Sequence, residues 1–94
     1  MNANTEELMK LVDEAAQEEV VKNDKNLYAA VVKAYKELNE DQNITIISGN
    51  LSGEINRYLL THDYKAPKSV VDLGQKLQKY AANRWGHVNP INLG

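Results

Sequence analysis

Apolar residues recur at steps of three and four along most of the chain, in four segments that short polar stretches separate. This spacing is the period of an α-helix that buries one face. The pattern therefore predicts an all-α fold with four helices, over about residues 5–22, 24–39, 44–62 and 67–85.

Local signals agree with the predicted ends of these helices. Asn4 with Glu7 three residues later resembles a capping box, and Asp24 is a good N-cap for the second helix. Pro67 suits the first turn of the fourth helix, and Gly86 suits a left-handed stop after it. Short connections join antiparallel neighbours, so we expect an up-down-up-down four-helix bundle.

The expected bundle occupies residues 1–94 as a single domain, with a short C-terminal tail over residues 86–94. Each helix contributes one apolar stripe to a shared core. The first stripe is Leu8, Leu11, Val12, Ala15, Ala16, Val20 and Val21, and the second is Leu27, Val31, Ala34, Tyr35 and Leu38. The third is Ile44, Ile47, Leu51, Ile55, Tyr58 and Leu59, and the fourth is Val70, Leu73, Gly74, Leu77, Ala81 and Trp85. Leu51, Ile55, Leu73 and Leu77 should be buried.

The third segment contains two features that a helix normally avoids. It opens with ITII, which favours a strand by propensity, but the wider helical period outweighs this preference. Gly49 and Gly53 each cost roughly 0.8–1 kcal/mol relative to alanine inside a helix. We expect them, with Ser48 and Ser52, to let another helix approach closely, so that Gly53→Ala would lower stability.

Composition excludes several classes of site. With no cysteine, the chain can form neither a disulfide nor a thiolate metal site, and a formal charge of −2 argues against general nucleic-acid binding. His62 and His87 lie far apart in sequence and lack the spacing of a zinc site, while His62 suits the end of the third helix. We therefore expect no enzyme activity, no metal and no cofactor.

The first residues lack the basic start and apolar run of a signal peptide, and nowhere do 18 apolar residues run together to span a bilayer. We expect a cytoplasmic protein.

Charge is unevenly distributed along the chain. Residues 1–25 carry seven acids and three bases, whereas residues 64–94 carry one acid and five bases. Attraction between opposite ends of a compact bundle is one explanation. The other is a cationic C-terminal surface that faces an anionic partner or the inner leaflet of a membrane.

The sequence resembles a known family in three runs, namely LYAAVVKAYKELNEDQ, ISGNLSGEINRYLL and PKSVVDLGQKLQKYA. Over about residues 5–85 it is similar to the cytoplasmic immunity proteins for pediocin-like (class IIa) bacteriocins, of the enterocin A immunity type. The resemblance implies an antiparallel four-helix bundle without enzymatic activity. It also implies that the protein engages the bacteriocin-bound mannose phosphotransferase permease from the cytosol and so prevents lethal leakage. In this family the C-terminal half discriminates among bacteriocins.

The outer face of the fourth helix and the tail are therefore the predicted partner-binding surface. Its residues are Lys68, Lys76, Lys79, Arg84, Trp85, His87, Val88 and Ile91. Two alternatives stay open: Trp85 could be a core plug that the tail covers, and the chain could be a small regulatory or adaptor bundle for another protein. We expect a monomer.

Overall fold

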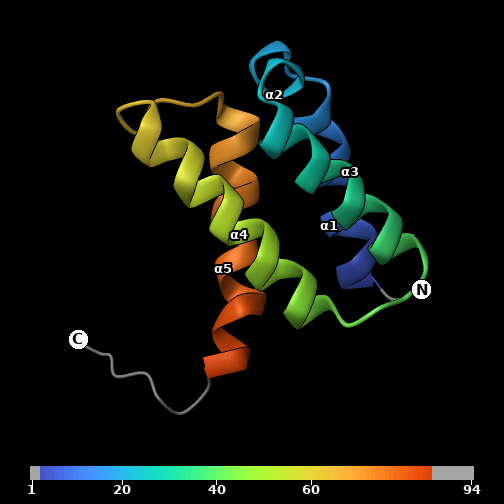
Figure 1. The fold of residues 1–94 in the computed structure, drawn as a ribbon. Coiled ribbons are helices and arrows are strands. Elements are labelled where there is room, and N and C mark those ends of the chain that lie inside the picture. The colour runs from blue at the N-terminus through green and yellow to red at the C-terminus, as the bar shows by residue number, and fades with distance from the viewer. Residues whose placement is uncertain (1–2, 86–94) are drawn as a thin grey trace.

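The computed structural model describes residues 3–85, with side chains to residue 81, and contains five α-helices and no strand in that range (Figure 1). They are α1 (Ala3–Ala16), α2 (Glu19–Asn23), α3 (Lys25–Asn39), α4 (Ile44–Thr61) and α5 (Lys68–Trp85). The predicted all-α class is confirmed. The predicted number of helices is wrong by one, because the first predicted helix is interrupted.

The interruption lies between Ala16 and Glu19. The Glu18 N–H donates to the Ala15 carbonyl at 3.1 Å, which tightens the last turn of α1. Glu18 then adopts an extended backbone, with φ −69° and ψ 135°, and α2 starts in a new direction. The Glu18 side chain accepts a 2.6 Å hydrogen bond from the Ser69 hydroxyl, which ties the break to the start of α5.

The break explains how α2 contributes to the core. In an unbroken helix of about 100° per residue, Val21 would lie roughly 140° from Leu8, on the solvent side. The change in direction instead buries Val21 completely. Val20, which was predicted to close the apolar stripe, is 42% exposed.

Side-chain caps start the next two long helices. Asp24 accepts a hydrogen bond from the Leu27 N–H at 2.9 Å, and Asn43 accepts from the Thr45 and Ile46 N–H groups at 2.9 and 3.2 Å. The Asn43 cap satisfies backbone donors that would otherwise be unpaired in the first turn of α4. This local bonding explains why ITII is helical despite its β propensity.

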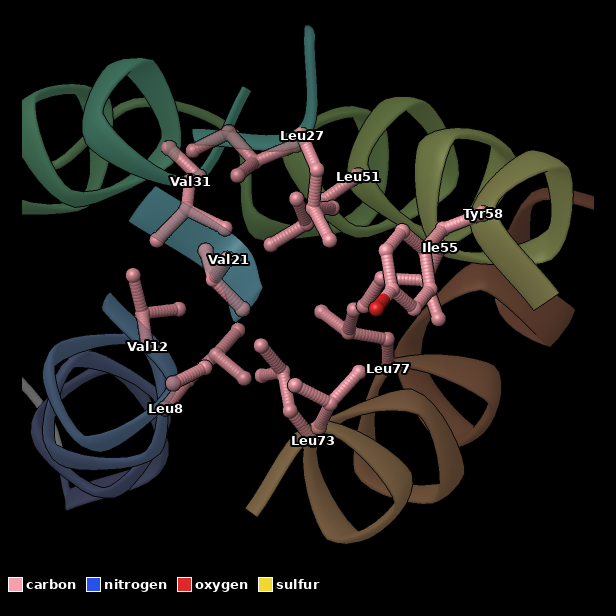
Figure 2. Close-up of a cluster of buried hydrophobic side chains, with 14 of the residues drawn as sticks. Leu8, Val12, Val21, Leu27, Val31, Leu51, Ile55, Tyr58, Leu73 and Leu77 are labelled. Atoms are coloured by element: carbon pink, nitrogen blue, oxygen red, sulfur yellow. The ribbon is translucent and has the colours of Figure 1, made fainter. Parts of the chain in front are cut away.

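The four long helices pack in a closed series. α1 contacts α3, α3 contacts α4, α4 packs most extensively against α5, and α5 contacts α1. Figure 2 shows side chains from all five helices converging on the enclosed interior. The core consists of Leu8, Val12, Ala15, Val21, Leu27, Val31, Ala34, Leu38, Ile47, Leu51, Ile55, Tyr58, Val70, Leu73 and Leu77. The predicted burial of Leu51, Ile55, Leu73 and Leu77 is thus confirmed.

Tyr35 is part of the predicted second stripe, but it lies at the rim of the core and not inside it. Tyr35 is 42% exposed and lies at the edge of α3 that faces α1, where it lines an open hollow with Tyr28 and Val32. The core beside α3 is filled by other side chains, among them Leu27, Val31 and Leu38 of the same helix, and the Tyr35 ring stays at the rim. A tyrosine at a rim can bury part of its ring and keep its hydroxyl in water.

The close-approach explanation of Gly53 is also wrong. A Cβ added at Gly53 would meet no heavy atom within 4 Å, so this part of α4 faces open space. The close contact between α4 and α5 instead involves Gly74, where an added Cβ would lie 3.6 Å from Ile55 Cγ2. Ser48 is completely buried, and its hydroxyl has no hydrogen-bond partner among the described residues.

Candidate partner-binding surface

α5 carries the cationic face that the sequence singles out. It starts directly after Pro67, whose carbonyl accepts from the Val70 and Val71 N–H groups at 3.0 and 3.1 Å. Val70, Leu73 and Leu77 then occupy the buried stripe of α5. The lysines lie off this stripe, but they differ in their surroundings.

Lys68 is in the first turn of α5 and is highly exposed. Its ammonium lies 2.9 Å from Asp72 Oδ2, one helical turn further on. The hydrogen bond that Lys68 donates to Asp72, followed by the negative charge of Asp72, raises the pKa of Lys68 above its ordinary value. Lys68 therefore stays protonated, and its pair with Asp72 is open to water.

Lys76 is not a free surface cation. Its side chain is only 24% exposed, and its ammonium lies 3.1 Å from Glu7 Oε1 on α1. Lys76 thus joins α5 to α1. At this position the basic end of the chain attracts its acidic start, and this contact supports the fold. Lys79, by contrast, is exposed and forms no ion pair with any residue whose side chain the structure describes.

The remaining predicted site residues lie beyond the part of the chain whose side chains the structure describes. Arg84 and Trp85 lie in the last turn of α5, beyond the described side chains. His87, Val88 and Ile91, with the whole predicted tail, lie outside the described residues. The described part of the predicted surface therefore consists of Lys68 and Lys79, with Lys76 partly withdrawn into a helix contact.

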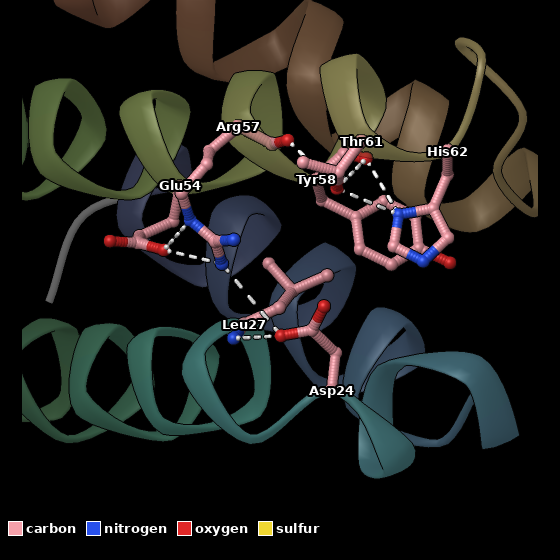
Figure 3. Close-up of polar contacts among 7 residues, drawn as sticks. All are labelled: Asp24, Leu27, Glu54, Arg57, Tyr58, Thr61 and His62. Atoms are coloured by element: carbon pink, nitrogen blue, oxygen red, sulfur yellow. Dashed lines mark hydrogen bonds and ion pairs between the residues drawn. The ribbon is translucent and has the colours of Figure 1, made fainter.

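A polar cluster joins α3 and α4 (Figure 3). The Arg57 guanidinium donates through Nε to Glu54 Oε1 at 3.1 Å, and its Nη2 lies 3.7 Å from Asp24 Oδ1. Asp24 also caps α3 through the Leu27 N–H. These contacts hold the start of α3 against the middle of α4, which is a structural role.

His62 ends α4 as its C-cap residue. Its Nδ1 lies 2.8 Å from the Tyr58 carbonyl, which can only accept, so Nδ1 carries the proton in this bond. The imidazole stacks on the Tyr58 ring with centroids 3.9 Å apart and an interplanar angle of 15°. The helix-terminal role predicted for His62 is confirmed. Within residues 3–81, no group of three or more histidine, aspartate or glutamate side chains is arranged to hold a metal ion.

Sequence reasoning missed the exposed apolar residues at the end of α4. Leu60 and Tyr64 are 64% and 70% exposed. Leu60 follows Leu59 directly but falls outside the helical stripe, and this offset was the signal that could have identified it. No described helix is both long and apolar enough to cross a membrane.

Comparison with known protein families shows to which family this helical domain belongs. The model of the bacteriocin immunity protein family matches residues 3–82. The chain belongs to that family. The match confirms the resemblance to the enterocin A immunity type. No curated protein and no solved structure matches the chain.

The region that matches the family model can be compared with the helices of the structure. The matched residues 3–82 include α1 to α4 and most of α5. Lys68, Lys76 and Lys79 lie inside the matched region, whereas Arg84, Trp85, His87, Val88 and Ile91 lie beyond it. The family assignment thus depends on the helical domain and not on those five residues.

Proposed function

We propose that this chain is a non-catalytic protein that protects its cell from a pediocin-like bacteriocin, acting from the cytoplasm. The observation that carries the proposal is the family match over residues 3–82. The described polar contacts agree with it, since Asp24, Arg57 and Glu7 are used to cap helices or join them. Such a framework suits a protein that binds another protein through its surface.

We further propose that the protein engages the mannose phosphotransferase permease in its bacteriocin-bound state. The support is the resemblance to the enterocin A immunity type together with the exposed cations of α5. Lys79 has no ion-pair partner among the described side chains, and Lys68 is paired only with the half-buried Asp72. Both ammonium groups can therefore meet an anionic partner without breaking a buried contact.

The arrangement inferred for the domain is an antiparallel up-down-up-down bundle of the four long helices, with α2 as a short insertion after α1. Its support is the order of contacts, in which each long helix meets the next and α5 meets α1. In such an arrangement α5 lies between α1 and α4, and its third side, with Lys68 and Lys79, faces solvent. We propose that this side, together with Arg84, Trp85 and the segment over residues 86–94, recognises the permease.

The test is protection of living cells. The protein is expressed in a sensitive strain, and the strain is challenged with a panel of pediocin-like bacteriocins. Survival with at least one peptide, and unchanged growth without peptide, is the expected result. Sensitivity to every peptide, in cells that contain the folded protein, would contradict the proposed function and favour the adaptor alternative.

A matched pair of variants tests the surface. Lys68→Glu with Lys79→Glu reverses two exposed charges on α5, and Lys33→Glu with Lys36→Glu reverses two exposed charges on α3. The α5 variant should lose protection, and the α3 variant should keep it. Equal protection by both, at equal melting temperature, would show that the α5 face is not the recognition surface. Deletion of residues 87–94 tests the C-terminal segment in the same assay.

A further inference from the structure

The solvent-facing side of α4 follows the helical period. Between positions 46 and 60, each exposed residue lies three or four residues from the next, and the set is Ile46, Asn50, Gly53, Asn56 and Leu60. At about 100° per residue, all five point within roughly 60° of the direction of Gly53. They therefore share one side of α4, which crosses in front of α5 in Figure 1. We call these five residues the α4 face.

The α4 face carries no charge, and its two largest side chains are apolar. Ile46 and Leu60 are 49% and 64% exposed, and two asparagine amides lie between them. Charges border the face with two of each sign, on Lys33, Glu37, Glu54 and Arg57. Glu54 and Arg57 already pair with each other at 3.1 Å. The face therefore offers no net charge to attract an anionic or a cationic partner.

The α4 face is symmetric about Gly53. Ile46 and Leu60 each lie seven residues from Gly53, and Asn50 and Asn56 each lie three residues from it. When two copies of α4 pack antiparallel about a two-fold axis at Gly53, Ile46 of one copy is level with Leu60 of the second copy. Asn50 is then level with Asn56, and each amide can both donate and accept a hydrogen bond. The face is thus complementary to itself, which a symmetric dimer requires.

Gly53 lies at the centre of this pattern without a role inside the chain. A Cβ added there would meet no heavy atom within 4 Å, so the packing of the single chain does not require glycine. Glycine is also a poorer helix former than alanine. Where two helices cross, however, glycine lets their backbones approach closely. Contact with a second copy therefore gives Gly53 a function that the single chain does not.

The neighbouring helices border the α4 face on both sides. Asn50 lines a hollow together with Ala30 of α3, and Asn56 lines another, of about 120 Å³, together with Val71 of α5. Val71 is 37% exposed and adds apolar surface beside the face. The face itself is one side of one helix, which is less than the roughly 800 Å² per partner of a standard interface. Association through it should therefore be weak.

We propose that two copies of this chain associate through the α4 face, with the two α4 helices antiparallel about a two-fold axis at Gly53. A partner of unrelated sequence would not require a pattern that is the same in both directions from Gly53, whereas a second copy does. The proposal does not depend on the proposed function, and the interface includes none of the α5 lysines. It modifies the expected monomer, because weak association populates the dimer only at high concentration.

Sedimentation equilibrium of the full chain tests the association. The apparent mass should rise from that of one chain toward that of two between about 10 µM and about 1 mM, with a dissociation constant on the order of 100 µM. Gly53→Lys should weaken association at least about tenfold, because two like charges would meet at the two-fold axis. The same variant should melt at an equal or higher temperature at low concentration, since lysine is the better helix former and the single chain has space for it. A dimer that forms equally well with Gly53→Lys would overturn the proposal.

Two further variants test the antiparallel register. Ile46→Lys and Leu60→Glu should each weaken self-association roughly tenfold. In an equal mixture the two variants should associate with each other, because the new charges of opposite sign are level and one Ile46–Leu60 contact remains. The matched control is Val32→Lys on α3, which is 48% exposed and should associate like the unmodified chain. A mixture no stronger than either variant alone would show that the register is wrong.

The remaining outcomes concern other occupants of the α4 face. A chain that is monomeric at every concentration, and dimeric only after deletion of residues 87–94, would show that this segment occupies the face and would overturn the proposal. A chain that is monomeric in both forms, but loses protection with Gly53→Lys, would show that another protein binds there, which also overturns it. Dimerisation through the face without protection in the challenge assay would support the association and contradict only the proposed function.

Discussion

The Lys76 ammonium on α5 lies 3.1 Å from Glu7 Oε1 on α1. This ion pair joins the acidic first part of the chain to its basic last part. It also divides the lysines of α5 into one that supports the fold and two, Lys68 and Lys79, that are available at the surface. Charge reversal along α5 therefore has different consequences at different positions.

Lys76→Glu should lower the free energy of unfolding by about 1 kcal/mol, because it places a second carboxylate against Glu7 in a partly exposed pair. Denaturant melts monitored by circular dichroism measure this loss. Lys79→Glu, the control on the same helix, should change stability by less than about 0.5 kcal/mol. Adding Glu7→Lys to Lys76→Glu should restore most of the loss, and a double variant no more stable than the single one would contradict the pairing.

Leu77→Ala should cost about 2–5 kcal/mol, since Leu77 is completely buried where α5 meets the core and its truncation leaves a cavity. Leu60→Ala is the matched control at an exposed leucine and should change the free energy of unfolding by less than about 0.5 kcal/mol. Urea melts of the two variants provide the comparison. Similar losses for both would mean that the inward face of α5 is misassigned.

Gly53→Ala should raise stability by up to about 1 kcal/mol, because the added methyl group meets no atom within 4 Å and alanine is the better helix former. Gly53→Val should gain less, since its branched side chain restricts rotamers in a helix. The melting temperatures of the two variants measure the difference. A lower melting temperature for Gly53→Ala would restore the close-packing explanation.

Asp24→Ala should lower stability by about 1–2 kcal/mol, because it removes the cap on the Leu27 N–H and the 3.7 Å contact with Arg57. Asp24→Asn keeps a capping oxygen and removes only the charge, so it should cost less than half as much. Thermal melts of both variants separate the two contributions. If Asp24→Asn is as damaging as Asp24→Ala, the charge on Asp24 matters more than the cap.

Much of the fold could be predicted from the spacing of apolar residues along the chain. The stripes that contain Leu8 and Val12, Leu27 and Val31, and Leu73 and Leu77 bury the expected face, because helical periodicity is a property of neighbouring residues. The predicted cap at Asp24 acts over three residues and so depends only on local sequence. The cap at Asn43 is equally local, although it was not predicted. The resemblance to the immunity family also followed from sequence, and the family match confirms it.

Tertiary structure decided what depends on residues far apart in the chain. The first helix ends at Ala16 because Val21 is buried in the core and Glu18 is bonded to Ser69 on α5. Both contacts involve residues that are distant in sequence. The partner of Lys76 lies on another helix, and no spacing along α5 reveals it.

The same holds for the rim of the molecule. Tyr35 occupies a position at which helical period alone predicts contact, and only the placement of the neighbouring helices shows a solvent-facing ring there. Gly53 lies two residues from both Leu51 and Ile55, so helical period places it roughly 160° from their stripe. The expectation of close packing at Gly53 came from the small residues around it, and the structure shows open space there. Sequence periodicity determines which face of a helix is apolar. How far the neighbouring helix extends over that face is determined by the packing of the whole domain.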